Sequence, residues 1–144
     1  MYDYDVFLAG YADAKWRSEF GDKIARDITI FDSMTSVYHL LDNGAKANLV
    51  AQELQNIELC EIVVFYLCPE WNSLYSMIVL GAASGSGKQI IVCMEPGIQS
   101  EEKIKLYCEY KGILVVNTLD DLVESVEECL SQAEIVASLG LDET

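Results

Sequence analysis

The segment Ile62-Val63-Val64-Phe65-Tyr66-Leu67 constrains the fold of this chain more than any other part of the sequence. Its side chains are apolar or aromatic at consecutive positions, whereas a strand with one face in water alternates apolar and polar residues. A strand without alternation is buried on both faces, as in the middle of a parallel sheet that helices cover on both sides. The segment therefore predicts an α/β fold.

Four further apolar runs, separated by segments with helical periodicity, indicate the same fold class. Strands are expected at residues 6–9, 28–31, 90–94 and 113–116, and helices at 14–26, 45–59, 73–83, 101–110 and from 119 onward. This alternation predicts a single doubly wound domain over residues 1–144, with a five-stranded, mostly parallel sheet in the flavodoxin-like order 2-1-3-4-5. The chain is expected to fray from residue 138 onward.

The charge of the chain excludes several classes of partner. It has 9 Lys and Arg against 24 Asp and Glu, a net charge of −15. Binding to a phosphate backbone requires clustered cations, so we expect no nucleic-acid partner. An anionic membrane surface is disfavoured for the same reason, and no apolar run approaches the roughly 18 residues of a membrane span. We expect no membrane partner either.

The five cysteines predict a reducing compartment. Their number is odd, and none belongs to a CxxC pair, so reduced thiols in a cytoplasmic protein are expected. The N-terminus also lacks the basic region and apolar stretch of a signal peptide. The one histidine, His39, has no close Cys or His neighbour, so we expect no metal site and no other cofactor.

Candidate ligand-binding residues lie in the loops after the first and third predicted strands, because ligands of such sheets bind where neighbouring crossovers diverge. In the first loop, glycine permits a sharp turn, and the next helix offers free N–H groups to an anion. Tyr11 could stack on a base or sugar, and Arg17 could reach a phosphate; alternatively, Trp16 is a core residue and Arg17 a surface charge. The candidates in this part of the chain are Ala9, Gly10, Tyr11, Asp13 and Arg17.

The second loop contains Trp71, Asn72 and Ser73. Asn72 and Ser73 are good helix N-caps, and they could instead turn their side chains toward a ligand. Trp71 is a large aromatic residue in a predicted exposed turn, where it could contact a ligand or a partner protein. Capping alone is the simpler interpretation of the two polar residues.

Several stretches, taken in order, resemble the nucleoside 2-deoxyribosyltransferase-like family, particularly its small bacterial and phage members. The resemblance extends to about Leu122 and implies the same fold, a nucleoside or nucleotide ligand, and a homodimer or larger assembly. The stretches that carry it are Val6–Gly10, Trp16-Arg17, Ile62–Glu70, Leu80-Gly81 with Gly87-Lys88, Pro96-Gly97, and Cys108 through Ile113.

The same resemblance implies cleavage of the N-glycosidic bond of a deoxynucleoside or nucleotide. Such chemistry needs a carboxylate beside the anomeric carbon, because the transition state resembles an oxocarbenium cation. In the family this glutamate lies on the helix after the third strand, where the present chain has Val79, and Ser76 matches an earlier polar residue of the motif. Residues 72–88 contain no Asp or Glu, so a shifted alignment does not restore the nucleophile.

Three hypotheses follow for function. The first is a nucleoside- or nucleotide-binding protein on this scaffold, with catalysis reduced or lost. The second is an active nucleoside deoxyribosyltransferase or nucleotide N-glycosidase that uses Glu70, Asp13 or Asp32 as a substitute carboxylate. The third is an acidic protein-interaction module that grips its partner through Trp71.

Overall fold

The computed structural model describes residues 4–11, 14–32, 41–70 and 74–140. Every strand pairing in these residues is parallel, and the sheet order is β2-β1-β3-β4-β5, which confirms the predicted doubly wound fold. In chain order the elements are β1 (Tyr4–Gly10), α1 (Ala14–Lys23), β2 (Ile30–Asp32), α2 (Asn43–Glu58), β3 (Cys60–Leu67), α3 (Leu74–Gly85), β4 (Gln89–Met94), α4 (Glu101–Lys111), β5 (Leu114–Val116) and α5 (Leu119–Ser138).

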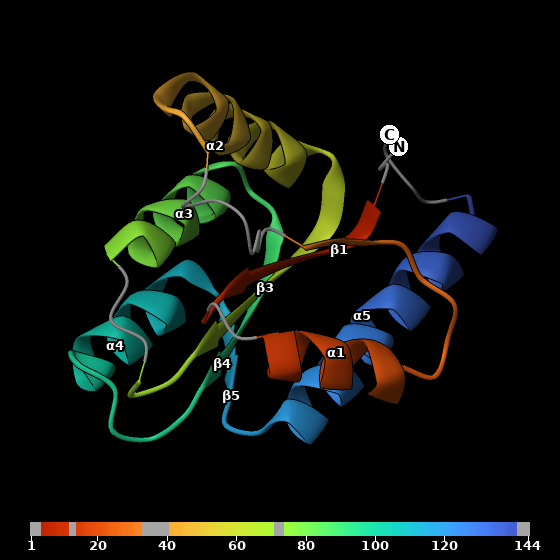
Figure 1. Cartoon of the computed structure of the whole chain (residues 1–144). Coiled ribbons are helices and arrows are strands. Elements are labelled where there is room, and N and C mark those ends of the chain that lie inside the picture. The colour runs from red at the N-terminus through yellow and green to blue at the C-terminus, as the bar shows by residue number, and fades with distance from the viewer. Residues whose placement is uncertain (1–3, 12–13, 33–40, 71–73, 141–144) are drawn as a thin grey trace.

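Helices cover both faces of the sheet (Figure 1). The helices α1 and α5 pack on one face, whereas α2, α3 and α4 pack on the other. On the central strand β3, Val63 and Phe65 belong to the cluster under α3, and Val64 belongs to the cluster under α1 and α5. All three side chains are fully buried, which explains the consecutive apolar residues of this strand.

Two boundaries near the start of the chain differ from the prediction. The helix α1 ends at Lys23 and not at residue 26, because the backbone N–H of Ala25 donates to the Glu127 carboxylate of α5. The strand β2 begins at Ile30 and not at residue 28. Just before it, the Thr29 N–H donates to the Asp5 carboxylate at 2.9 Å, so a side chain of β1 takes the place of a ladder partner.

Capping residues set several helix ends. The Asp42 carboxylate accepts from the Ala45 N–H at 2.8 Å, which starts α2 two residues before the predicted position. The Thr118 hydroxyl accepts from the Asp121 N–H at 3.1 Å at the predicted start of α5. Gly112 follows the last residue of α4 with a φ of +72°, a backbone conformation that favours glycine at a helix C-terminus.

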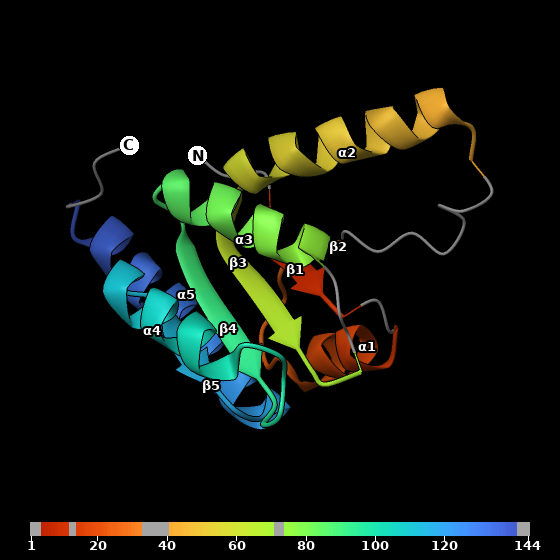
Figure 2. The same cartoon turned by 90° about the vertical axis from the view of Figure 1, so that its left-hand side faces the viewer.

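The helix α2 is largely exposed. Figure 2 shows it beside α3, and only Asn56 and Ile57 of its residues are buried. All five cysteines are free; four are buried and Cys129 is half-buried. Among the helices of the described ranges, none is long and apolar enough to cross a membrane.

Candidate functional site

The carboxyl end of β1 closes directly onto β3 because residue 10 is glycine. Gly10 pairs with Tyr66 in the parallel ladder and has a φ of +106°. A Cβ atom at this position would lie 2.3 Å from the carbonyl oxygen of Tyr66, so a larger residue cannot keep this geometry. The N–H of Tyr11 donates to the same carbonyl at 2.8 Å. The predicted sharp turn is therefore present, and it places Tyr11 beside β3.

Arg17 binds the loop that precedes its own helix. Its side chain is 4 % exposed, so the alternative that it is a surface charge is wrong. Its Nη1 donates to the Leu8 carbonyl at 3.0 Å and to the Asp32 carboxylate, and its Nη2 donates to the carbonyls of Gly10 at 3.4 Å and Tyr11 at 3.2 Å. Burial lowers the pKa of the Arg17 guanidinium, and the Asp32 carboxylate opposes that shift.

Trp16 is a core residue, which is one of the two alternatives that the sequence left open. Its indole stacks on the ring of Tyr66, with 4.9 Å between ring centroids and 15° between planes, and the Arg17 Cζ lies 4.8 Å from the indole centroid. The indole N–H donates to the Tyr11 carbonyl at 2.7 Å. The Trp16 side chain thus links the first loop to the central strand.

Glu95 is a site residue that the sequence analysis missed. Its carboxylate accepts from the Tyr66 hydroxyl, and its own N–H donates to the Leu67 carbonyl at 2.9 Å. Burial raises the pKa of the Tyr66 hydroxyl, and the bond to the Glu95 carboxylate adds to that shift. The signal was present in the sequence, because Glu95 directly follows β4, where side chains reach the carboxyl edge of a parallel sheet.

These contacts form one continuous row of side chains across the carboxyl ends of β2, β1, β3 and β4. We call it the α1-side row, because two of its members belong to α1 and it lies on that face of the sheet. An acidic side chain stands at each end of the row. Its members, in spatial order, are Asp32, Arg17, Trp16, Tyr66 and Glu95.

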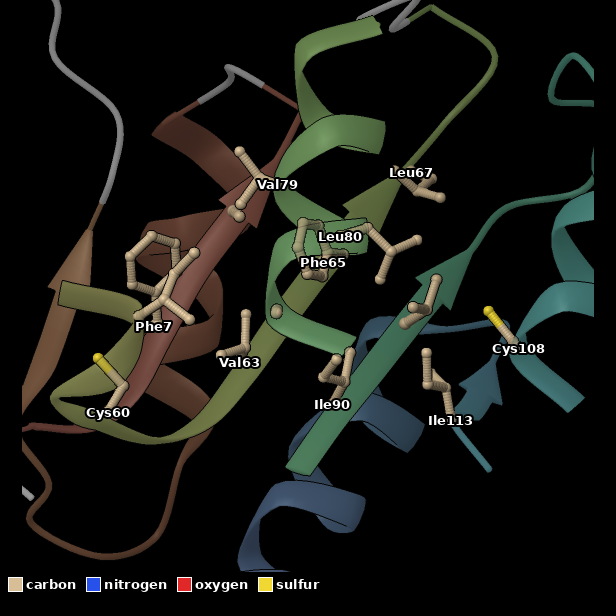
Figure 3. Close-up of a cluster of buried hydrophobic side chains, with 14 of the residues drawn as sticks. Phe7, Cys60, Val63, Phe65, Leu67, Val79, Leu80, Ile90, Cys108 and Ile113 are labelled. Atoms are coloured by element: carbon tan, nitrogen blue, oxygen red, sulfur yellow. The ribbon is translucent and has the colours of Figure 1, made fainter. Parts of the chain in front are cut away.

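On the opposite face, the position that the resemblance assigns to the nucleophile lies in the core. Val79 is 1 % exposed and belongs to an apolar cluster, here called the α3-side cluster, that also contains Phe7, Phe65 and Leu80. Figure 3 shows these side chains in the layer between α3 and the sheet. Ser76, one helical turn earlier, is buried as well.

The remaining candidate residues that the structure describes do not join the α1-side row. Ala9 is buried in the α3-side cluster, whereas Glu70 is exposed beyond the end of β3. Burial raises the pKa of the Cys68 thiol to about 11, and its hydrogen bond with Glu70 adds to the shift. Four predicted site residues lie outside the described residues: Asp13, Trp71, Asn72 and Ser73. Over the part of the chain that the structure describes, no group of three or more His, Cys, Asp or Glu side chains could hold a metal ion.

Comparison with known proteins places this sequence in a family. A profile described as nucleoside 2-deoxyribosyltransferase like matches residues 3–97, which run from β1 to the loop after β4 and include both Val79 and the α1-side row. No curated protein matches the chain. The profile covers more than half of the sequence. The chain therefore belongs to the nucleoside 2-deoxyribosyltransferase-like family.

Proposed function

We propose that this protein binds a nucleoside or nucleotide at the carboxyl ends of β1 and β3, and that its transferase chemistry is reduced or lost. The observation that carries the proposal is the buried Val79 at the position where the resemblance expects a glutamate. An aliphatic side chain has neither the charge to stabilise an oxocarbenium ion nor the lone pair to capture it. Loss of one key electrostatic group commonly lowers the rate about 100- to 1000-fold.

The proposed ligand lies over Gly10 and the amino ends of α1 and α3. Gly10 supports this placement, because its turn brings the carboxyl ends of β1 and β3 close together at the edge where the ligand is proposed to bind. Tyr11 is half-buried beside the same edge, so one face of its ring can pack on a sugar or base. Trp71 is proposed to pack on the ligand from the other loop.

Isothermal titration tests the binding half of this proposal. The four common 2′-deoxynucleosides and their 5′-monophosphates form the panel, and at least one of the eight is expected to bind. Tyr11→Ala should weaken that binding by about tenfold, since loss of one aromatic stacking contact has effects of this order. Tyr110→Ala is the matched control, because Tyr110 is 85 % exposed on α4. Absence of binding across the panel contradicts the proposal.

The enzyme hypothesis keeps one supporting observation. Asp32 ends β2 and Glu70 follows β3, so two of the three substitute carboxylates stand at the edge where the ligand is proposed to bind. Asp32 is engaged by Arg17, which stabilises its charge but also holds it against the sheet. Release of free base that disappears in Asp32→Asn or Glu70→Gln would favour this hypothesis over the first.

We also propose a cytoplasmic protein that forms a dimer or larger assembly. The five free thiols support a reducing compartment. The helix α3 carries no charged residue, and its Ile78 is 66 % exposed, which supports burial against another subunit. Light scattering after size-exclusion chromatography is expected to give at least twice the 16.1 kDa of one chain. A monomer at all concentrations contradicts the assembly.

A further inference from the structure

Acidic residues mark the carboxyl edge of the whole sheet. Asp32 ends β2, and Glu70, Glu95 and Asp120 follow β3, β4 and β5. The sequence places Asp13 after β1. By contrast, no Lys or Arg occurs among the four residues that follow any of the five strands. The residues at or shortly after the strand ends therefore carry charge of one sign, although two of the five are paired with cations of α1: Asp32 with Arg17, and Asp120 with Lys23 at 3.0 Å.

Arg17 does not change this balance for a ligand. Both of its Nη atoms donate to carbonyl oxygens of the first loop, and Nη1 also donates to the Asp32 carboxylate. Its Nε is buried and has no hydrogen-bond partner within the residues described. The guanidinium is thus turned into the protein and closed off from a phosphate at the edge.

The lysines around the edge lie on the helices, and Lys23 of α1 is paired with Asp120, which follows the outermost strand β5. Lys15 is 79 % exposed at its side chain, and its Nζ lies 4.0 Å from a carboxylate oxygen of Glu19. On α4, Lys103 is exposed and Lys105 donates to Glu101 at 2.8 Å. These long, solvated side chains do not form a fixed anion site beside the strand ends.

Glu95 is an edge carboxylate that is held in place without a cation as its printed partner. Tyr66 stands at the switch point itself, because it pairs with Gly10 across β1 and β3. Its hydroxyl binds the Glu95 carboxylate, and the Glu95 N–H is bound to Leu67 of the same strand. Both the backbone and the side chain of Glu95 are therefore fixed to β3, and the residue is half-buried.

We propose that Glu95, held by Tyr66, is a specificity-determining residue through which this site selects unphosphorylated nucleosides over their 5′-phosphates. The inference rests on the proposed nucleoside or nucleotide binding and names which of the two ligands is preferred. A carboxylate accepts hydrogen bonds from sugar hydroxyls and from N–H groups of a base. The same charge repels a phosphate dianion, and water screens that repulsion least where the carboxylate is partly buried.

The test compares two affinities in one protein. Each 2′-deoxynucleoside of the panel and its 5′-monophosphate are titrated at low and at high salt. The nucleoside is expected to bind at least about tenfold more tightly at low salt, and the gap should narrow as salt screens the edge. In Glu95→Gln, which removes the charge but keeps an oxygen for the Tyr66 hydroxyl, the ratio of the two affinities should fall several-fold.

A matched variant keeps the result specific. Glu109→Gln removes the same charge from an exposed position near the end of α4, and it should leave the ratio unchanged. Equal or tighter binding of the monophosphate by the wild type overturns the specificity of the site and leaves the proposed binding function standing. An unchanged ratio in Glu95→Gln overturns the role of Glu95. Absence of binding by both ligand classes overturns the proposed function itself.

Discussion

The two faces of the sheet are covered by side chains of different chemistry. On one face, the α1-side row connects four strand ends through two carboxylates, a guanidinium, an indole and a phenol. On the other face, the α3-side cluster fills the space between the helices and the sheet with hydrophobic side chains, Val79 among them. The polar groups that contact one another across the strand ends therefore lie on the α1 side, whereas hydrophobic packing together with the buried Ser76 occupies the α3 side.

The difference between the two faces shows that the fold and the groups available for chemistry are separate properties. The family match covers both faces, and a shared fold does not by itself fix which reacting groups a member carries. A glutamate at position 79 would be a charge among hydrophobic neighbours unless a ligand or water reached it. Valine instead contributes to the core, and the polar groups that remain at the edge are suited to binding. Four substitutions test this contrast.

The largest effect is expected for Val79→Glu. An unpaired carboxylate in the α3-side cluster should lower the free energy of unfolding by about 3 to 5 kcal/mol, because the charge loses its hydration. Val79→Ala, which only leaves a small cavity, should cost about 2 kcal/mol. Urea unfolding of both variants measures the difference. A cost below that of alanine would mean that water reaches position 79, contrary to the packed cluster.

Gly10→Ala tests the boundary between the two sides. The added Cβ would meet the Tyr66 carbonyl oxygen at 2.3 Å, and the φ of +106° is unfavourable for alanine. We expect a loss of about 3 kcal/mol in unfolding free energy from strain and displacement of the strand. The control is Gly81→Ala in α3, where a Cβ meets nothing within 4 Å and helix propensity favours alanine. Similar stability of the two variants would contradict the close approach of β1 and β3.

Arg17→Leu tests the α1-side row. Removing the guanidinium leaves the carbonyls of Leu8, Gly10 and Tyr11 without this donor, and should cost about 2 to 3 kcal/mol. Arg26→Leu is the matched control, because Arg26 forms its ion pair with Glu134 at the surface and should cost less than about 1 kcal/mol. Thermal and urea unfolding measure both. An equal cost would show that Arg17 does not organise the loop.

The smallest effect is expected for Tyr66→Phe. Loss of the hydroxyl should cost about 1 kcal/mol at neutral pH. Because the pKa of Tyr66 is raised in the folded protein, its contribution is fully present below the ordinary tyrosine pKa of about 10 and is lost as pH rises toward the folded value. The stability difference between wild type and Tyr66→Phe should therefore shrink from pH 9 upward. A difference that grows with pH would contradict the Tyr66–Glu95 bond.

The sequence predicted the fold closely because burial leaves a periodic signal. Residues 62–67 of β3 are apolar or aromatic at each position since helices cover both faces, and the glycine at position 10 marked the turn that β1 makes beside Tyr66. The pattern of one chain does not encode which polar groups meet across strands. The sequence left open whether Arg17 reaches a phosphate or is a surface charge, because nothing local shows that the carbonyls of Leu8 and Gly10 accept hydrogen bonds from it.

Glu95 shows the same limit from the other direction. Nothing next to Glu95 in the sequence points to its partner, because Tyr66 lies on a different strand. Its position directly after a buried strand does predict that Glu95 lies at the carboxyl edge, because the residues after parallel strands converge there. The hydrogen bond between Tyr66 and Glu95 is visible only in the folded structure.

Release of free base is the measurement that bears most directly on the central claim. The wild-type protein is incubated with each 2′-deoxynucleoside and its monophosphate, with and without a second base as acceptor, and the products are separated by chromatography. Because position 79 presents an aliphatic side chain in a packed cluster, we predict no base release or exchange above the protein-free control. Sustained turnover by the wild type, abolished by Asp32→Asn or Glu70→Gln, would contradict it.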